Sequence, residues 1–262
     1  MSLFELTLIG GPWARRLARR RAGFEAMPWG EAAKGASPEE VDAARWVWTQ
    51  SAFSEHASAA AFAEIATCLI AAGAPIDLVA AAGDFVADEV IHAELSARLA
   101  MAFGGAVALE VDPTKLVRPP IAADPLVRAA ELVVRTSCVG EALTVPILKT
   151  TKARAESPLV RAVVTRIARD ESAHAQLGPW FLDWAADRLS DADREHLGRV
   201  AGGAVRAFAP IFSGSCAGGS DLGVLDCATY DAAFRIALAR NVVRPLAARG
   251  IVIPPEDLAA VA

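Results

Sequence analysis

Two segments of the sequence repeat one pattern of acidic and histidine residues. Residues 88–95 read DEVIHAEL and residues 170–177 read DESAHAQL, so both follow D-E-x-x-H-A-x-L. In a helix, Glu and His three positions apart lie on one face, where they can bind a cation together. The octet occurs twice, about 80 residues apart, in a chain with four histidines, so coincidence explains it poorly. The repeat predicts two metal-binding pairs, which are Glu89 with His92 and Glu171 with His174.

Two isolated carboxylates complete the pattern. Glu141 is the only charged residue in Thr136–Leu148, and Glu55 is the only acid in residues 53–62. An anion on an apolar helix face is costly to bury unless its pKa rises or a cation lies beside it. Glu55 and Glu141 each precede a D-E-x-x-H motif by roughly 30 residues. This interval covers the rest of one long helix and half of the next, antiparallel helix, which returns the chain to the same height. The sequence thus predicts six metal ligands at one height: Glu55, Glu89, His92, Glu141, Glu171 and His174.

Long helices must position these residues. Abundant alanine and few aromatic residues (6%) favour helix, and no strand pattern competes, so we expect an all-α four-helix bundle with further helices. Residues 104–123 contain three prolines and no helical period, but at about 3.3 Å per residue they can cross a whole bundle. Pro146 cannot donate to the carbonyl of Ala142 and predicts a bend or bulge beside Glu141. Gly and Pro signals delimit helices at about 38–72, 75–103, 124–155, 157–189, 190–211 and 227–248.

This organisation divides the chain into three parts. Residues 1–40 are an N-terminal segment with an arginine cluster, which either forms a solvated face or docks an acidic partner. Residues 41–189 are the bundle, and residues 190–262 are a C-terminal helical extension packed on it, with a turn at 214–223. His196 is expected on the surface, and Tyr230, the only tyrosine, receives no role.

Composition narrows the function classes. A net charge of −5 argues against a nucleic-acid partner, because phosphate binding needs a basic face. Glu64 and many alanines interrupt the apolar run at residues 57–76, unlike a membrane-spanning helix. The N-terminus places its apolar stretch before its arginines, the reverse of a secretory signal. We therefore expect a cytoplasmic protein with neither a nucleic-acid nor a membrane partner.

The six predicted ligands resemble those of the ferritin-like di-iron carboxylate superfamily. It includes bacterial multicomponent monooxygenases, ribonucleotide reductase small subunits, acyl-carrier-protein desaturases and arylamine oxygenases. The resemblance covers roughly residues 43–189, and the doubled motif is specific to the superfamily but not to one reaction. It implies that Glu89 and Glu171 bridge or chelate two metal ions. The other ligands would then be the histidines, one to each ion, and the terminal or shifting carboxylates: His92, His174, Glu55 and Glu141.

The resemblance also implies roles for three neighbouring residues. Asp88 and Asp170 would hydrogen-bond ligand histidines and fix their tautomers, the alternative being that they are ordinary acids on a helix surface. Thr144, one turn after Glu141, resembles the threonine that oxygen-activating members place near dioxygen, and it is the candidate catalytic residue. Thr144 could equally satisfy the carbonyl that Pro146 leaves free.

These features predict an oxidoreductase that activates dioxygen to oxidise or oxygenate a small organic substrate. Its cofactors would be two iron ions, with manganese at one or both sites as a variant, because four carboxylates and two imidazoles suit these metals better than zinc or copper. A ferredoxin- or flavin-type donor would supply electrons, and a homodimer is expected from the superfamily. Two alternatives are a metal-handling protein (ferroxidase or peroxide scavenger) and a non-catalytic bundle. The substrate does not follow from the ligand set.

Overall fold

The computed structural model describes residues 1–31, 35–208 and 221–261. Within them the protein is an all-α helical bundle, which confirms the predicted fold class. Two π-helical segments, Val134–Glu141 and Leu238–Val243, join α4 to α5 and α8 to α9. Short 3₁₀ turns cover Phe24–Ala26, Trp29–Glu31, Pro113–Lys115 and Ala186–Arg188. The helices are α1 (Gly11–Ala18), α2 (Pro38–Ala71), α3 (Ile76–Ala102), α4 (Pro125–Val133), α5 (Ala142–Arg154), α6 (Pro158–Trp184), α7 (Asp191–Phe208), α8 (Cys227–Ala237), α9 (Arg244–Ala247) and α10 (Pro255–Ala259).

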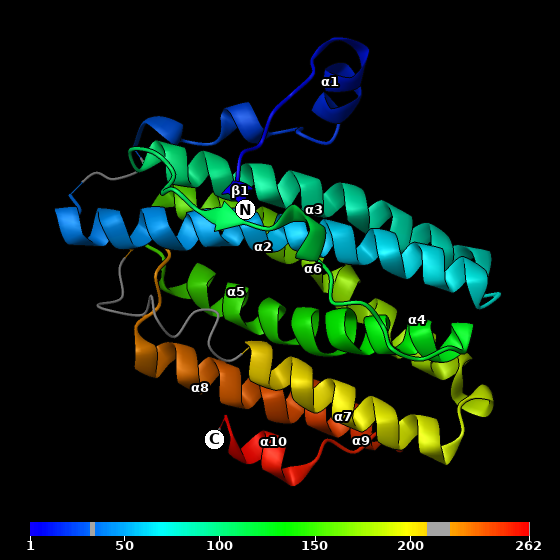
Figure 1. Cartoon of the computed structure of the whole chain (residues 1–262). Coiled ribbons are helices and arrows are strands. Elements are labelled where there is room, and N and C mark those ends of the chain that lie inside the picture. Colours follow the sequence, from blue (N-terminus) through cyan, green and yellow to red (C-terminus); the bar gives the residue numbers. More distant parts are fainter. Residues whose placement is uncertain (32–34, 209–220, 262) are drawn as a thin grey trace.

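Four long helical rods of the described chain form the bundle: α2, α3, the continuous run from α4 to α5, and α6 (Figure 1). The rod α2 packs against α3 and α4, and α6 packs against α3 and α5. Residues 104–123 cross the bundle from the end of α3 to the start of α4, as predicted. Because the crossover returns the chain to the opposite end, the third rod runs in the same direction as the second.

Local capping explains where the rods begin. Ser37 and Glu40 form a capping box at the start of α2, in which each side chain accepts a hydrogen bond from the other's backbone N–H. Asp124 accepts from the amides of Leu126 and Val127 at the start of α4. Gly73 follows α2 with a φ of 65°, which a side chain would disfavour. These residues are the sequence signals that delimited the helices.

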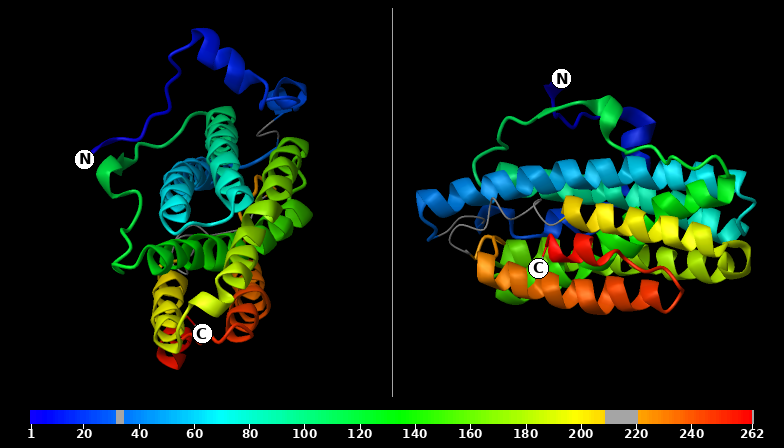
Figure 2. Two further views of the ribbon diagram at one scale, coloured as in Figure 1. Left: turned by 90° about the vertical axis from the view of Figure 1, so that its right-hand side faces the viewer. Right: turned by 60° about the horizontal axis from the view of Figure 1, so that its bottom comes forward.

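The C-terminal helices share the core of the bundle. The helix α7 packs on the π-helical segment Val134–Glu141, and α8 packs on α5. Leu197 of α7 and Phe234 of α8 belong to the same buried cluster as Phe62 of α2. Seen end-on, α7, α8 and α10 lie beyond α5 and α6 from α2 and α3 (Figure 2, left). The last residues of the helix predicted at about 190–211, those beyond Phe208, lie outside the described residues, as does most of the turn predicted at 214–223.

One pair of strands escaped the sequence prediction. The strand β1 (Ser2–Leu3) pairs antiparallel with β2 (Glu110–Val111), so the N-terminus adds a strand to the crossover. Two residues are too short for any alternating pattern to be recognised. No helix in the described part of the chain is both long and apolar enough to span a membrane.

A buried acid that the sequence analysis missed fastens the crossover to α4. Glu131 is 1% exposed and accepts hydrogen bonds from the amides of Ile121 and Ala122 at 2.8 and 2.9 Å. His196 Nε2 of α7 lies 2.8 Å from the same carboxylate, so the expectation that His196 is a plain surface residue was wrong. Burial raises the pKa of Glu131, but the hydrogen bonds from His196 and the two amides outweigh it and hold the pKa below 4.5.

Replacing Glu131 with Gln is expected to lower the free energy of unfolding by about 2 kcal/mol at pH 7, because one amide then loses its charged acceptor. Chemical denaturation would measure the loss. Glu110→Gln, at an exposed acid of the same crossover, is the control and should change stability by less than about 0.5 kcal/mol. A carboxylate with a lowered folded pKa stabilises above its unfolded pKa and ceases to do so as pH falls through the folded one. The difference between wild type and variant should therefore shrink below about pH 4, and a constant difference would contradict this account.

Candidate metal centre

The six predicted ligands converge in the middle of the bundle. Two groups of four residues could each hold a cation, with ligand atoms within 4.8 Å of one another in each group. Glu89 and Glu171 belong to both groups, and we call them the shared carboxylates. The first group adds Glu55 of α2 and His92 of α3, and the second adds Glu141, the last residue of the π-helical segment, and His174 of α6. We call the six residues the ligand cluster.

Each shared carboxylate presents one oxygen to each imidazole. Glu171 Oε1 lies 2.9 Å from His92 Nδ1, and Glu171 Oε2 lies 2.7 Å from His174 Nδ1. Glu89 Oε2 lies 3.7 Å from His92 Nδ1, and Glu89 Oε1 lies 2.9 Å from His174 Nδ1. The carboxylate of Glu55 lies at the edge of the cluster, 4.0 Å from His92 Nδ1. Two carboxylates that each face two imidazoles create two adjacent cation positions.

Several buried polar atoms of the ligand cluster lie close to one another but make no hydrogen bond of suitable geometry. The side chains of Glu89, His92 and His174 are 0% exposed. Buried polar atoms are almost always paired, and leaving them unpaired costs free energy. Oxygen and imidazole nitrogen atoms aimed at one another across two small spaces suit divalent metal ions, which would satisfy them. The unpaired atoms of the cluster are both oxygens of Glu89, Nδ1 of His92, Oε2 of Glu171 and both ring nitrogens of His174.

Crowding shifts the pKa values of the carboxylates. Burial raises the pKa of Glu55 and of Glu141 well above 4.5, and the shared carboxylates raise both further. The pKa of Glu171 is instead lowered, because the two imidazoles outweigh the opposing effect of burial. In the metal-free chain, the peripheral carboxylates therefore hold protons more strongly than free carboxylic acids, while Glu171 is ionised.

Both imidazoles are held protonated. Burial alone would lower the pKa of His174, but Asp88 and the shared carboxylates outweigh it and raise that pKa to about 12. The pKa of His92 is raised well above 6.5, again against the effect of burial, by Asp170 and the shared carboxylates. A metal ligand must be deprotonated, so cations would displace these protons.

The motif aspartates lie beside the histidines in a crossed arrangement. Asp170 of α6 has Oδ2 3.4 Å from Nε2 of His92 on α3, within hydrogen-bond range. Asp88 of α3 has Oδ2 3.7 Å from Nε2 of His174 on α6, too long for a hydrogen bond but close enough for an ion pair. Each aspartate thus approaches the histidine of the opposite motif, and neither is a plain surface acid.

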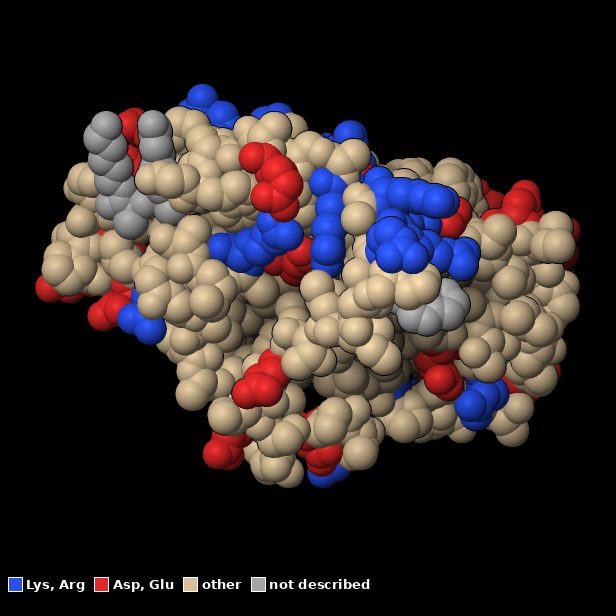
Figure 3. Space-filling view, turned by 90° about the horizontal axis from the view of Figure 1, so that it is seen from above, with Lys and Arg blue, Asp and Glu red and all other residues tan. Residues whose placement is uncertain are grey.

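Arginines cover the outer side of both aspartates. Arg20, from the segment after α1, binds Asp88 at 2.9 Å, and Arg166 of α6 binds Asp170 at 2.7 Å. Arg166 also donates to the backbone carbonyl of Arg20. Figure 3 shows this face, where Lys and Arg side chains gather near α1. The sequence predicted no such partners for the arginine cluster, because the contacts of Arg20 with Asp88 and Arg166 join residues 68 and 146 positions apart.

A cavity adjoins the ligand cluster at Glu55 and Glu141. It has a volume of about 400 Å³ and lies between α2, the π-helical segment, α5 and the chain around α8; we call it the α2–α5 cavity. Glu55, Glu141 and Thr144 line it, so the candidate catalytic threonine shares a wall with two predicted ligands. Small residues near the ligands, Ser58 and Gly140, also line it. The sequence did not reveal that Arg135 and Tyr230 also border the cavity, because their place depends on tertiary packing.

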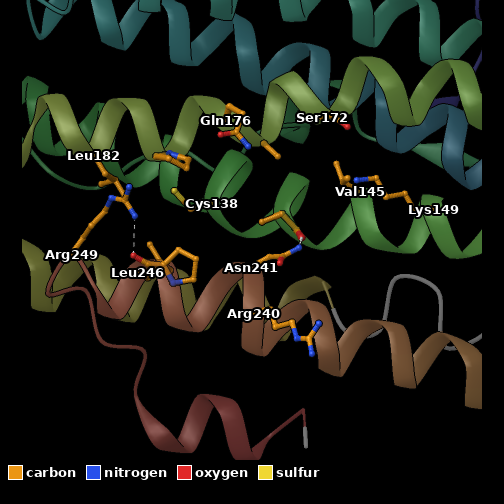
Figure 4. A pocket seen from close by; sticks show the side chains of 14 residues that line it. Cys138, Val145, Lys149, Ser172, Gln176, Leu182, Arg240, Asn241, Leu246 and Arg249 are labelled. Atoms are coloured by element: carbon orange, nitrogen blue, oxygen red, sulfur yellow. Dashed lines mark hydrogen bonds between the residues drawn. The ribbon is translucent and has the colours of Figure 1, made fainter.

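The π-helical segment confirms the bulge predicted beside Glu141. It ends at Glu141, and α5 continues through Pro146. The side chain of Asn241, from the second π-helical segment, donates to the free carbonyl of Ala142 at 3.3 Å (Figure 4). Thr144 therefore does not serve that carbonyl, and its side chain makes no hydrogen bond within the described residues. The hydroxyl of Thr144 is left available to the cavity.

Comparisons with protein-family models, curated proteins and solved structures found no match for this chain. What the geometry establishes is a buried cluster of carboxylates and imidazoles that can bind metal.

Proposed function

We propose that the protein is a ferritin-like di-iron oxidoreductase, with manganese as a variant at one or both positions, that activates dioxygen to oxidise or oxygenate a small organic molecule. One observation carries the proposal: the shared carboxylates face both imidazoles, and the other two carboxylates of the cluster, Glu55 and Glu141, line a cavity of about 400 Å³. The crossover between the second and third rods is the connectivity of ferritin-like bundles, which supports the same assignment.

The ligand cluster fits two ions of iron or manganese. One would be held by Glu55, His92 and the shared carboxylates, and the other by Glu141, His174 and the same carboxylates. Four carboxylates and two imidazoles form a hard donor set that favours these metals over zinc or copper. The chemistry that bound iron supplies in such a site is the reduction of dioxygen with electrons from an external ferredoxin- or flavin-type donor.

The chain's own residues position the substrate and control protons. Apolar side chains of the α2–α5 cavity, among them Phe53 and Ile147, would contact the apolar part of a substrate beside the cluster. Glu55 and Glu141 form the end of the cavity nearest the cluster, and Thr144 offers a hydroxyl one turn beyond Glu141. This hydroxyl can donate a hydrogen bond to a molecule in the cavity or pass a proton to Glu141.

A second candidate is a ferroxidase, which oxidises iron as its substrate. The partial exposure of Glu55, whose side chain is 14% accessible, favours it, because iron could reach the cluster through the cavity. We prefer an oxidoreductase that acts on an organic molecule, because a cavity of this volume is larger than a hydrated ion requires.

Measurement of dioxygen consumption distinguishes the oxidoreductase from the ferroxidase. The chain loaded with ferrous iron under nitrogen would be freed of excess metal and exposed to air-saturated buffer, with or without dithionite-reduced ferredoxin. The proposal expects consumption that recurs with each addition of electron donor while the iron stays bound. Consumption that follows only added ferrous iron would favour the ferroxidase, and none in either case would overturn both. The Glu171→Ala variant is the control and should be inactive.

A further inference from the structure

A second cavity borders the π-helical segment. It has a volume of about 440 Å³ and lies between the crossover, α4, the π-helical segment and α7; we call it the α4–α7 cavity. Among the described residues, none on its wall belongs to the ligand cluster, so it is separate from the metal centre. The charged residues that line it are four arginines and one acid: Arg118, Arg135, Arg199, Arg206 and Glu131. Positive charge therefore predominates on this wall.

Two of the four arginines have acidic partners. Arg199 binds Glu195 at 2.6 Å, and Arg206 binds Asp257 of α10. Neither of these two acids lines the cavity, but each neutralises the arginine that it binds. The unbalanced charge on the wall therefore comes from the other two arginines.

Those two arginines, Arg118 and Arg135, have no acidic partner. Neither forms an ion pair with a carboxylate in the described part of the chain, and the rest of the chain contains no acidic side chain. Glu131, the acid on the same wall, already accepts hydrogen bonds from two backbone amides and lies 2.8 Å from Nε2 of His196. The partners of Glu131 thus occupy the carboxylate that could have balanced the arginines.

The two unbalanced arginines lie next to each other. The guanidinium of Arg135 donates a hydrogen bond to the backbone carbonyl of Arg118. Burial and the like charge of Arg118 lower the pKa of Arg135, which is half-buried. Adjacent guanidinium groups repel each other, and burial of one of them adds the cost of removing its charge from water. An anion that contacts both side chains would relieve both costs.

The closeness of the two charges indicates which anion fits. A carboxylate carries one charge and a dicarboxylate separates its two, whereas a phosphate monoester carries nearly two charges at pH 7 on one tetrahedral group. Guanidinium groups bind phosphate oxygens through paired N–H donors. The volume of about 440 Å³ corresponds to roughly 15 water molecules at about 30 Å³ each, far more than a phosphate group fills. Apolar side chains, among them Ile121, Val139 and Val200, line the cavity as well.

We propose that the α4–α7 cavity binds a phosphate monoester with an apolar body, whose phosphate group contacts Arg118 and Arg135 and whose body packs against Ile121, Val139 and Val200. Burial of the body on these side chains adds affinity that a free phosphate ion lacks. The site goes beyond the proposed function, because it requires neither the metal ions nor a substrate in the α2–α5 cavity.

Calorimetric titration of the full chain tests the proposal. The ligands are phenyl, 2-naphthyl and hexyl phosphate, the sulfate ester and the alcohol that correspond to each, and inorganic phosphate. At about pH 7.5 each phosphate ester carries nearly two charges, whereas the sulfate ester has the same shape with one. At least one phosphate ester is expected to bind about 10- to 100-fold more tightly than its alcohol. The same ester should bind about 10-fold more tightly than its sulfate and than inorganic phosphate.

Two variants connect this binding to the arginines. Arg118→Gln and Arg135→Gln should each weaken binding of the phosphate ester by about 10-fold, and in the double variant the ester should bind no more tightly than its alcohol. Arg118 is exposed, so its variant should fold even if substitution of the half-buried Arg135 disturbs the chain. Circular dichroism of each variant would verify the fold.

The control is Arg240→Gln. Arg240 is an exposed arginine that lines a different pocket, between α5, α6 and the second π-helical segment (Figure 4). This variant should bind every ligand like wild type. Phosphate and sulfate esters bound with equal affinity, inorganic phosphate bound as tightly as every ester, or no binding of any phosphate ester would overturn the proposal. Undiminished binding in both Arg118→Gln and Arg135→Gln would overturn it too. These results do not depend on dioxygen, so they leave the oxidoreductase proposal to its own test.

Discussion

Replacing Glu171 with alanine is expected to abolish binding of both metal ions, whereas Glu141→Ala is expected to remove only one. The reason is geometric: Glu171 directs one oxygen toward each imidazole and belongs to both ligand groups, while Glu141 belongs to one. Metal per chain, measured by mass spectrometry after removal of unbound ions, should fall from two to none in the first variant and from two to one in the second. Circular dichroism should remain helical in both, because the four rods do not depend on these side chains for their packing.

A matched control comes from α2. Glu64 lies nine residues after Glu55 and outside both ligand groups, so Glu64→Ala should retain two ions. Retention of both ions by the Glu171 variant, or an identical loss in the Glu141 and Glu64 variants, would contradict the assignment of Glu171 as a shared ligand.

Metal loading at pH 7 is expected to release about two to four protons per chain. His92 and His174 both carry protons in the metal-free chain, because their pKa values are raised well above 6.5 and to about 12. The raised pKa values of Glu55 and Glu141 add up to two more. Calorimetric titration in buffers of different ionisation enthalpy measures the number directly.

The same protons set the pH dependence of metal affinity. Ligands must lose protons to bind metal, so each unit of falling pH should weaken the overall binding of the two ions by about 100-fold or more. The Glu171→Ala variant, which is expected to bind no metal, should release no protons when metal is added. An affinity independent of pH between 6 and 8 would show that the imidazoles are already neutral.

The long helices and the ligand cluster could be predicted because their signals are local and periodic. Pro38, Gly73 and Pro125 delimit helices through backbone chemistry that any context preserves. Glu and His three residues apart share a helix face, and rods of about 30 residues bring corresponding positions together. Lone acids in apolar segments, Glu55 and Glu141, could be recognised because burial of a charge demands a partner.

The surroundings of the cluster could not be predicted, because they depend on contacts between distant segments. Asn241 reaches Ala142 across 99 residues, and Arg20 reaches Asp88 across 68. Arg135 resembles any arginine on a helix until tertiary packing places it on the cavity wall. Glu131 escaped notice because two of its partners are backbone amides, which carry no sequence signal, and the third, His196, lies 65 residues away. The crossed pairing of Asp88 and Asp170 likewise depends on how α3 and α6 face each other.

The most direct test of the account is the metal content of the wild-type chain. Protein produced with iron and manganese in the medium, then freed of loosely bound ions, would be analysed for metal per chain. The account predicts close to two ions per chain, iron or manganese, because the two ligand groups share Glu89 and Glu171 and lie side by side. A chain that binds no metal, or a single ion that Glu55→Ala and Glu141→Ala leave in place, would contradict it.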